Sequence, residues 1–415
     1  MSSAHVAFVG LGYIGLPTAV TMAKHGVKVT GVDVNQNTVD RVNEGKVTIV
    51  EPGLEEALKE VVDNGNLTAT TEMIHADVYI IAVPTPFKED HEGDLSYIMS
   101  AASNIAPQLQ GDELVILEST SPPLTTEKMA AKILELRPDL AAHRDGETSE
   151  KPVVYFAHCP ERILPGYAME ELITNDRIIG GMSEEATRRA TEVYRSFCKG
   201  ELLGTTATTA ELAKLTENSF RDVNIAFANE LSLICDKLGV DVWELIELAN
   251  HHPRVNILQP GPGVGGHCIA VDPWFIVSSD RENSNLIRTA REVNDRKPNW
   301  VINKVREAVK DDSVVATLGL AFKANIDDLR ESPALNITKQ LASDMPSTKI
   351  LAVEPNVVEL PSSLVGTGNI ELTNLDDALE QADVIVVLVD HKEFFDVPAT
   401  KLAGKTVVDT KGLWR

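Results

Sequence analysis

Cysteine is scarce in this chain, with four residues among 415 and no CxxC pair: Cys159, Cys198, Cys235 and Cys268. This spacing excludes the usual zinc-ligand patterns and offers no disulfide framework, so we expect no metal. A strand is expected from His5 onward, which leaves no room for a signal peptide. No apolar run approaches the roughly 18 to 20 residues of a membrane helix. We therefore expect a cytoplasmic protein without a membrane partner.

Basic residues are also few. Lys and Arg number 38 against 62 Asp and Glu, and the formal net charge is -24. Such a surface repels nucleic acid and anionic membranes, which excludes a nucleic-acid partner. A phosphate-bearing ligand would need a local group of cations and helix N-termini. Most of the acidic excess is accounted for by an ordinary soluble surface.

A glycine motif follows the first predicted strand. Gly10, Gly12 and Gly15 form GxGxxG at the start of a helix, and the next strand ends at Asp33. The first glycine permits a tight turn, the second lets a pyrophosphate approach the backbone, and the third lets helix and strand pack closely. A carboxylate at Asp33 would accept hydrogen bonds from a ribose diol and repel a 2′-phosphate. The pattern predicts NAD as the cofactor.

Strands and helices then alternate through the first half of the chain. We expect strands within 66–71, 76–84 and 113–120, and helices over 53–62 and 95–109. This alternation is typical of an α/β fold with a doubly wound parallel sheet. Residues 141–151 are polar, and we expect a structureless insertion there before a strand resumes at Val153.

A long helix is predicted over 208–238, opened by a Thr208/Glu211 capping box and closed by Gly239. Its apolar residues occupy more than one face, which indicates packing on another subunit. From Ser313 a second strand-turn-helix series begins, and residues 382–391 echo residues 76–86, although any buried parallel strand has a similar apolar sequence. We therefore expect two Rossmann-like domains joined by a long central helix and a helical dimerisation region, with boundaries 1–205, 206–310 and 311–415.

Polar side chains follow two predicted strands. Pro84 and Thr85 lie in "VPTP", and Ser119 and Thr120 lie in "LEST". Ligands of open α/β sheets bind at the carboxyl ends of strands, so these residues are cofactor candidates. Ordinary turn chemistry is the alternative.

Cationic and amide side chains gather at two further places. Lys214, Asn218 and Arg221 are spaced i, i+4, i+7 and share one helix face. Because the flanking positions are largely apolar, we expect this stripe to line a cleft rather than to be a solvated face. Lys323 and Arg330 flank "ANIDD" and are able to neutralise a diphosphate, although cations in polar loops are common.

The segment "PGPGVGGHCIAVDPW" carries four glycines directly before Cys268. Such a loop folds tightly against a ligand and presents the thiol. With Asp272 four residues on, this context favours Cys268 as a nucleophile. The other three cysteines are interpreted as inert small apolar residues.

With these residues assembled, the chain resembles the UDP-glucose/GDP-mannose dehydrogenase family over essentially its full length. The segments that carry the resemblance are "GLGYIGLP", "HCPERILPG", "ELAKLTENSFRDVNIAFANELS", "ANHHPRVNILQPGPGVGGHCIAVDPWF", "GLAFKANIDDLRESPA" and "VVDTKGLWR". The resemblance implies an N-terminal NAD domain, a central dimerisation region and a C-terminal UDP-binding domain, with the active site between the outer two.

By position, the resemblance makes Cys268 the nucleophile and Lys214 the proton donor or acceptor. It makes Asn218 and Asp272 partners that position water and the oxyanion. The two remaining polar active-site positions are Glu161 and Thr120. Implied NAD contacts are Tyr13, Ile14, Asp33, Thr85, Thr120 and Arg330. Implied substrate contacts include the catalytic Glu161, Lys214 and Asn218, together with Arg162, Ile163, Arg221, His252, Arg254, Gly265, Phe322, Lys323 and Lys411. His252 and Arg254 are expected to reach in from a neighbouring subunit of a homodimer or larger homo-oligomer.

The resemblance also bears on the substrate. Arg221, His252, His267 and "IAVD" depart from the UDP-glucose branch and match the N-acetylhexosamine branch. "HHPRVN" favours UDP-N-acetyl-D-mannosamine, with UDP-GlcNAc, UDP-GalNAc and UDP-glucose as alternatives. The implied reaction takes two hydrides from C6, one to each of two NAD, through a thioester on Cys268 that water hydrolyses. Its product would supply a surface-polysaccharide pathway.

Three other functions are alternatives to this interpretation. A hydroxy-acid dehydrogenase would share the first domain and the long helix but needs neither Cys268 nor a second α/β domain. A nucleotide-sugar-binding protein without chemistry would not need the set Lys214, Asn218, Cys268 and Asp272. A 4,6-dehydratase or epimerase usually carries YxxxK, which does not occur in the sequence.

Overall fold

The computed structural model describes residues 4–49, 51–88, 91–164, 166–266 and 268–415. The chain divides into two compact units, Met1–Thr216 (unit 1) and Glu217–Arg415 (unit 2). Each contains a mainly parallel sheet with helices packed on it, which confirms the predicted α/β fold class.

The sheet of unit 1 has the strand order β3-β2-β1-β4-β5-β7-β8-β9, with the short β6 paired to β7. Its strands are β1 (His5–Val9), β2 (Lys28–Val32), β3 (Leu67–Thr70), β4 (Val78–Ile81), β5 (Leu114–Leu117), β6 (Ala141–Ala142), β7 (Val153–His158), β8 (Arg177–Gly181) and β9 (Leu202–Thr206). The pairing is parallel throughout except between β7 and β8. The predicted parallel, doubly wound arrangement therefore holds for β1 to β5. The expectation of no structure at 141–151 is wrong for Ala141–Ala142, which form β6, and is confirmed for 143–151, which contain no helix or strand.

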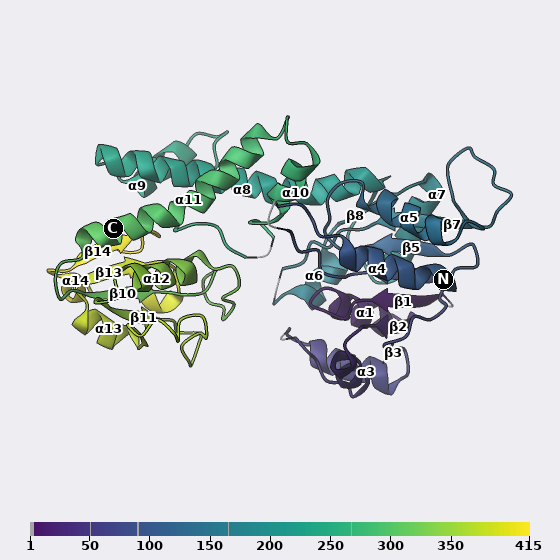
Figure 1. Ribbon diagram of the computed structural model, residues 1–415, viewed down its shortest axis with the longest axis horizontal. Helices are drawn as coiled ribbons and strands as arrows, with labels where there is room; N and C mark the ends of the chain where they lie inside the picture. Colours follow the sequence, from purple (N-terminus) through teal and green to yellow (C-terminus); the bar gives the residue numbers. More distant parts are fainter. Residues whose placement is uncertain (1–3, 50, 89–90, 165, 267) are drawn as a thin grey trace. The chain divides into compact units, whose positions relative to one another are not determined.

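Helices cover both faces of this sheet (Figure 1). They are α1 (Gly15–Lys24), α2 (Gln36–Asn43), α3 (Leu54–Asp63), α4 (Ser96–Ile105), η1 (Ala106–Gln108), α5 (Thr125–Leu136), α6 (Ala168–Thr174) and α7 (Glu184–Tyr194). Alternate residues of β1 enter two separate cores: Val6 and Phe8 pack with α1, α3 and α7, whereas Ala7 and Val9 pack with α4 and α5. Burial of each large apolar side chain stabilises the fold by about 1.5–3 kcal/mol.

The long helix α8 (Ala207–Leu238) has 32 residues. The predicted Thr208/Glu211 capping box is wrong, because Thr208 lies inside the helix and the Thr206 hydroxyl accepts from the Thr209 N–H at 3.3 Å. Glu211 instead accepts from the N–H groups of Leu124 and Thr126 at 2.7 Å each, at the start of α5. The predicted end is confirmed, since Gly239 has a φ of +69° just after Leu238.

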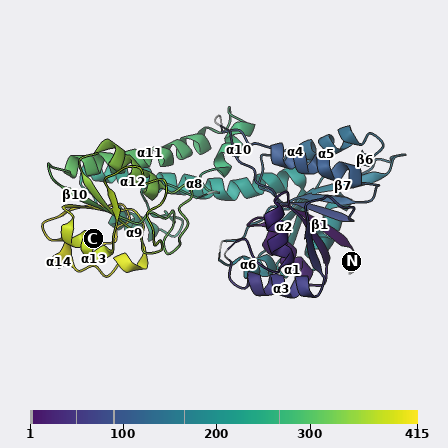
Figure 2. The same ribbon diagram turned by 60° about the horizontal axis from the view of Figure 1, so that its bottom comes forward.

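The sheet of unit 2 has five parallel strands in the order β12-β11-β10-β13-β14. They are β10 (Val314–Leu318), β11 (Lys349–Val353), β12 (Ile370–Leu372), β13 (Val384–Val387) and β14 (Thr406–Asp409). The helices are α9 (Val242–Asn250), α10 (Asp272–Ser279), α11 (Asn285–Ala308), α12 (Pro333–Asp344), α13 (Leu375–Gln381), η2 (Lys392–Phe394) and α14 (Ala399–Leu402). Helices α11 and α12 pack on one face of the sheet and α13 on the other (Figure 2). This order repeats that of β3-β2-β1-β4-β5, so the predicted likeness of the two α/β regions is confirmed.

Across the part of the chain that the structure describes, no helix combines the length and the apolar character that a membrane span needs.

Candidate active site

The glycine turn after β1 has the shape that a dinucleotide requires. Gly10 has a φ of +97°, and a Cβ added to it would lie 2.5 Å from the carbonyl oxygen of Ala82. A Cβ on Gly15 would lie 1.9 Å from the carbonyl oxygen of Gly10, so helix α1 could not pack so closely with a larger residue. At Gly12 an added Cβ would meet no atom within 4 Å. The backbone at Gly12 is therefore uncovered, as the approach of a pyrophosphate requires.

Asp33 directly follows β2, beside this turn. One carboxylate oxygen accepts from the Leu11 N–H at 2.9 Å, and the other accepts from the Asn35 N–H at 2.9 Å. These backbone bonds fix the carboxylate at the edge of the turn while Asp33 stays partly exposed. Its position suits an acceptor for ribose hydroxyls.

The ends of the neighbouring strands β4 and β5 are joined by Ser119. Its hydroxyl accepts from the Val83 N–H at 2.9 Å and donates to the Val83 carbonyl at 2.8 Å. Ser119 is 8% exposed, so it holds the segment of Pro84 and Thr85 against the end of β5. Thr120, the next residue, is partly exposed at that edge of the sheet.

Glu161 lies in the segment after β7 and is 8% exposed. Its two oxygens accept from the Arg162 N–H at 2.6 Å and from the Arg177 guanidinium at 2.7 Å. Arg177 is itself 3% exposed, at the start of β8. The buried guanidinium holds the Glu161 carboxylate in one orientation, a role that sequence reasoning did not assign.

A second buried carboxylate shares this arginine. Glu118 lies 3.6 Å from the Arg177 guanidinium and accepts from the Tyr194 hydroxyl at 3.1 Å. Burial, and next the charge of Glu161, raise the pKa of Glu118 against the opposing effect of Arg177. One guanidinium thus faces two carboxylates, and the raised pKa of Glu118 favours its neutral form. The sequence does contain a signal that could have identified Glu118, because an acidic residue directly follows the apolar run "LVIL".

Glu51 links the glycine turn to the segment that carries Arg162 and Ile163. It accepts from the Tyr13 hydroxyl at 3.2 Å and from the N–H groups of Gly166 and Ala168 at 2.9 and 2.7 Å. Glu51 is 7% exposed, and sequence reasoning missed it.

Unit 2 brings three of the predicted catalytic residues together. Cys268 is exposed, whereas the other three cysteines are buried. The Asp272 N–H donates to the Cys268 carbonyl at 2.9 Å, which closes a turn that leads into α10. The Asp272 carboxylate accepts from the Asn218 side-chain amide at 2.5 Å. Lys214 precedes Asn218 by one helical turn on α8, so both side chains lie on one face of that helix.

The glycine-rich loop before Cys268 also packs on two predicted substrate residues. A Cβ on Gly265 would lie 3.1 Å from the Phe322 side chain and 2.5 Å from the Glu331 carbonyl. A Cβ on Gly261 would lie 3.9 Å from the Lys411 ammonium. Phe322 and Lys411 therefore each border this loop, at Gly265 and at Gly261.

Other predicted residues lie elsewhere in the two units. Arg330 pairs with Asp328 through bonds of 2.6 to 3.1 Å. Lys323 and Arg221 are exposed, as are His252 and Arg254 in the turn after α9. His267 lies outside the described residues. Thr120, Glu161 and Lys214 belong to unit 1, whereas Asn218, Cys268 and Asp272 belong to unit 2.

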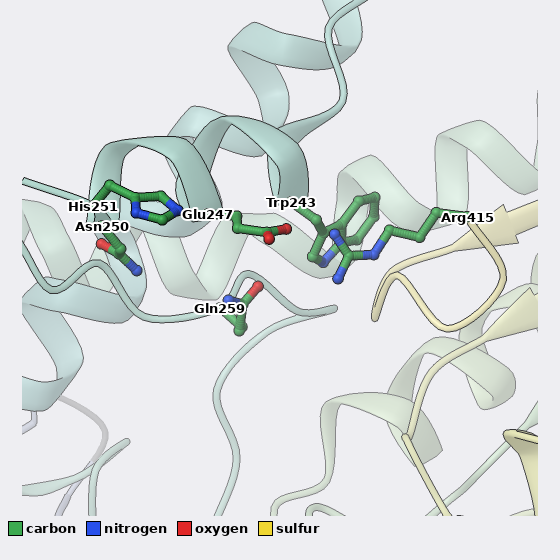
Figure 3. Close-up of a pocket in the computed structure, with 6 residues that line it drawn as sticks. All are labelled: Trp243, Glu247, Asn250, His251, Gln259 and Arg415. Carbon is green, nitrogen blue, oxygen red and sulfur yellow. The ribbon is translucent and has the colours of Figure 1, made fainter.

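A pocket of about 430 Å³ in unit 2 was not anticipated from the sequence. Its lining residues are Trp243, Glu247, Asn250, His251, Gln259 and Arg415. Figure 3 shows the Arg415 side chain beside the Trp243 ring, and the guanidinium lies 6.0 Å from the ring centroid. Gly412 allows this packing, because a Cβ there would lie 2.5 Å from the ring. The pocket therefore adjoins the turn that carries Lys411 and offers an aromatic ring with polar groups.

Comparison with known proteins identifies the class that these features define. Models of the UDP-glucose/GDP-mannose dehydrogenase family match residues 4–198 (NAD binding domain), 208–296 (central domain) and 316–415 (UDP binding domain). The chain therefore belongs to this family of NAD-dependent dehydrogenases.

Individual relatives span the whole chain. The UDP-N-acetyl-D-mannosamine dehydrogenase of Escherichia coli K12 is 55% identical, with 100% of both chains covered. An NDP-N-acetyl-D-galactosaminuronic acid dehydrogenase of Ralstonia solanacearum is 53% identical, over 99% of this chain and 96% of its own. The solved UDP-D-ManNAc dehydrogenase of Pyrococcus horikoshii is 39% identical with a TM-score of 0.84, over 99% of this chain and 96% of that one.

Proposed function

We propose that the protein oxidises the C6 alcohol of UDP-N-acetyl-D-mannosamine to the carboxylate, with two NAD consumed per sugar. The observation that carries this proposal is the exposed Cys268 thiol on a glycine loop, beside the Asn218–Asp272 pair, in a chain that belongs to a nucleotide-sugar dehydrogenase family. An alcohol becomes a carboxylate only by losing two hydrides. A nucleophile that retains the aldehyde between these steps is therefore useful.

The residues of unit 1 hold the cofactor and manage the first proton. Bound NAD would supply the acceptor for the hydride that leaves C6. The turn at Gly10, Gly12 and Gly15 would hold its pyrophosphate, and Asp33 its ribose. Lys214 takes the alcohol proton, directly or through water, and steadies the oxyanion.

The residues of unit 2 carry the covalent steps. The Cys268 thiol adds to the aldehyde, with its sulfur bonding to carbon and its proton passing to the oxygen. The thiohemiacetal would lose its second hydride to a second bound NAD and its hydroxyl proton to water, which gives the thioester. Water then attacks the thioester carbon, the C–S bond breaks, and the carboxylate leaves while the thiol is restored. Asn218 and Asp272, hydrogen-bonded at 2.5 Å, are suited to hold this water, with Glu161 as a further acceptor.

The nucleotide end of the substrate is assigned to the UDP-binding region. Lys323 and Lys411 supply cations for the diphosphate, and Phe322 packs on the loop at Gly265. Ile163, Arg162 and Arg221 are assigned to the remaining substrate contacts. His252 and Arg254, exposed in the turn after α9, are assigned to a partner subunit.

We extend the proposal to the assembly, its location and its domain division. Helix α8 exposes Phe220, Phe227 and Leu238, which are 68%, 52% and 70% exposed, and a second copy would cover this apolar surface. This surface fits a homodimer or larger homo-oligomer. We place the protein in the cytoplasm and divide the chain into regions 1–205, 206–310 and 311–415. The uronate product would feed surface-polysaccharide synthesis.

The test is the amount of NADH released from a limiting amount of sugar at excess NAD. UDP-N-acetyl-D-mannosamine is compared with UDP-GlcNAc, UDP-GalNAc and UDP-glucose. Two NADH per UDP-N-acetyl-D-mannosamine, with little from the others, is expected. Two NADH from UDP-GalNAc instead would favour the activity suggested by the Ralstonia relative's name. One NADH per sugar would contradict the thioester route, and none from any sugar would indicate a binding protein.

A further inference from the structure

A row of buried polar side chains runs between α8 and α11 in unit 2. Asp222, Asn229 and Arg291 are each 0% exposed, and Asn294 is 1% exposed. Burial of polar and charged groups costs free energy unless each finds a partner. The burial of four polar side chains between two helices is therefore not explained by packing alone.

These four residues form one continuous chain of hydrogen bonds. The Asn229 amide donates to the Asn294 side-chain oxygen at 2.8 Å. The Asn294 amide donates to the Asp222 carboxylate at 2.8 Å and to the Asp222 carbonyl at 3.0 Å. The Arg291 guanidinium donates to the same Asp222 carboxylate at 2.5 Å. Each side chain is thereby oriented by its neighbour, which makes the row rigid.

The residues at the two ends of this row, Asn229 and Arg291, each form a hydrogen bond with the loop that carries Cys268. The Asn229 oxygen accepts from the Gly261 N–H at 2.9 Å, at the start of the glycine run. The Arg291 guanidinium donates to the Ile269 carbonyl at 3.4 Å, one residue after Cys268. Gly261 is buried and Ile269 is partly buried. A segment with four glycines has large conformational freedom, and these two bonds restrain it on either side of the thiol.

We infer that Asn229 and Arg291 are positioning residues for Cys268, acting through the backbone of its loop. They hold the thiol where a C6 aldehyde would form, and this inference rests on the proposed function. Displacement of the loop would affect the Cys268 steps more than substrate or NAD binding. Because a misplacement of about 1 Å can cost on the order of a hundredfold in rate, the restraint has a measurable effect.

Two variants interrupt the row at its two ends. Asn229→Ala removes the acceptor for the Gly261 N–H. Arg291→Lys keeps a cation beside Asp222 but lacks the branched guanidinium that also reaches Ile269. The matched control is Lys304→Met, because Lys304 bridges the same two helices to Asp236 at 2.7 Å without a bond to the loop.

Three readouts on the full chain separate positioning from stability. The first is NADH per UDP-N-acetyl-D-mannosamine, with released aldehyde trapped by semicarbazide. The second is the rate at which iodoacetamide alkylates Cys268, measured by mass spectrometry without NAD or sugar. The third is the melting temperature together with the KM for each substrate.

We expect both variants to lose about tenfold to a hundredfold in kcat with KM nearly unchanged. NADH per sugar should fall below two, aldehyde should be trapped, and the alkylation rate should change severalfold. Lys304→Met should match the wild type in all these respects. A folded Arg291→Lys protein with two NADH per sugar and the wild-type alkylation rate would overturn the inference. If the wild type itself releases fewer than two NADH, the proposed function fails, and the alkylation rates alone decide the positioning role.

Discussion

Lys297 is a buried lysine whose titration should control the stability of unit 2. It is 2% exposed, on α11, and its ammonium donates to the Ser232 hydroxyl at 2.5 Å and lies 3.8 Å from the Trp300 ring centroid. Burial lowers the pKa of Lys297 from 10.5 to about 7, although Asp236 acts in the opposite direction. The folded protein therefore holds this lysine partly neutral at neutral pH.

The direction of the pH effect follows from proton binding. Between the folded pKa of about 7 and the unfolded value of 10.5, the unfolded chain binds more protons than the folded one. Stability contributed by this site therefore rises with pH across that window. Lys297→Met removes the titration and retains most of the side-chain volume. With about 1.4 kcal/mol for each pKa unit, the wild type should gain on the order of 3 kcal/mol relative to this variant between pH 7 and pH 10.

Tryptophan fluorescence makes the measurement specific, since all four tryptophans lie in unit 2: Trp243, Trp274, Trp300 and Trp414. Urea unfolding of wild type and Lys297→Met is followed at several pH values, and other titrating groups cancel in the difference. At pH 7 the variant should be the more stable protein. Stability curves that run parallel from pH 7 to pH 10 would refute the reasoning.

Three other predictions follow from the two units. Gly12→Ala should weaken NAD binding, measured by calorimetry, with little change in melting temperature. Gly15→Ala should lower the melting temperature by several degrees. Equal effects of the two variants on the melting temperature would contradict the assignment of Gly12 to the pyrophosphate. Because the pKa of Glu118 is raised, the folded state should lose stability as pH rises above the ordinary carboxyl range, and Glu118→Gln should abolish that loss in pH-dependent melting. Cys268→Ser should bind UDP-sugar and NAD nearly normally yet fail to complete the reaction, and undiminished turnover would exclude the thioester.

The alternation of strands and helices in both α/β regions could be predicted because its signals are local. Buried apolar runs, glycine turns and helical periodicity each lie within about 30 residues, the length of one βαβ unit. The same locality explains the failed capping box at Thr208. The sequence pattern suggested a bond from Glu211 within its own helix, but its carboxylate meets the start of α5, 85 to 87 residues away.

The residues that support the site were missed for a related reason. Glu51 and its partner Ala168 are 117 residues apart, and Arg291 and Asp222 are 69 apart. Residues so far apart in the chain form no periodic pattern, so their pairing cannot be recognised from the sequence. Cys268 could be proposed as the nucleophile from the sequence because its glycines lie close to it in the chain. The buried groups that orient its loop could be seen only once α8 and α11 were packed.

The two units share one strand order and one kind of turn after the first strand of each sheet, although one belongs to the NAD binding domain and the other to the UDP binding domain. Gly319 after β10 has a φ of +93°, close to the +97° of Gly10, and each is followed by a leucine whose N–H donates to an acid at the end of the next strand. That acid is Asp33 in unit 1 and Glu354 in unit 2. The backbone turn is therefore the same in both units.

The side chains around the second turn suit a different ligand. Ala321 and Ala324 stand where unit 1 has the second and third glycines, so the backbone approach that a pyrophosphate needs is reduced. Glu354 is 4% exposed, and its carboxylate accepts five hydrogen bonds: one from His391 at 3.0 Å, two from the N–H groups of Leu320 and Ala321, and two from the backbone N–H and side-chain amide of Asn356. Burial would raise the pKa of Glu354, but the bond from His391 and the backbone donors lower it to about 2. The hydrogen bonds of this carboxylate are all made within the protein, so it is unavailable to a ribose. The exposed Lys323 adds a cation at the turn. A dinucleotide therefore fits the turn of unit 1, whereas the turn of unit 2 offers neither the close backbone approach nor a free carboxylate and carries an exposed lysine instead.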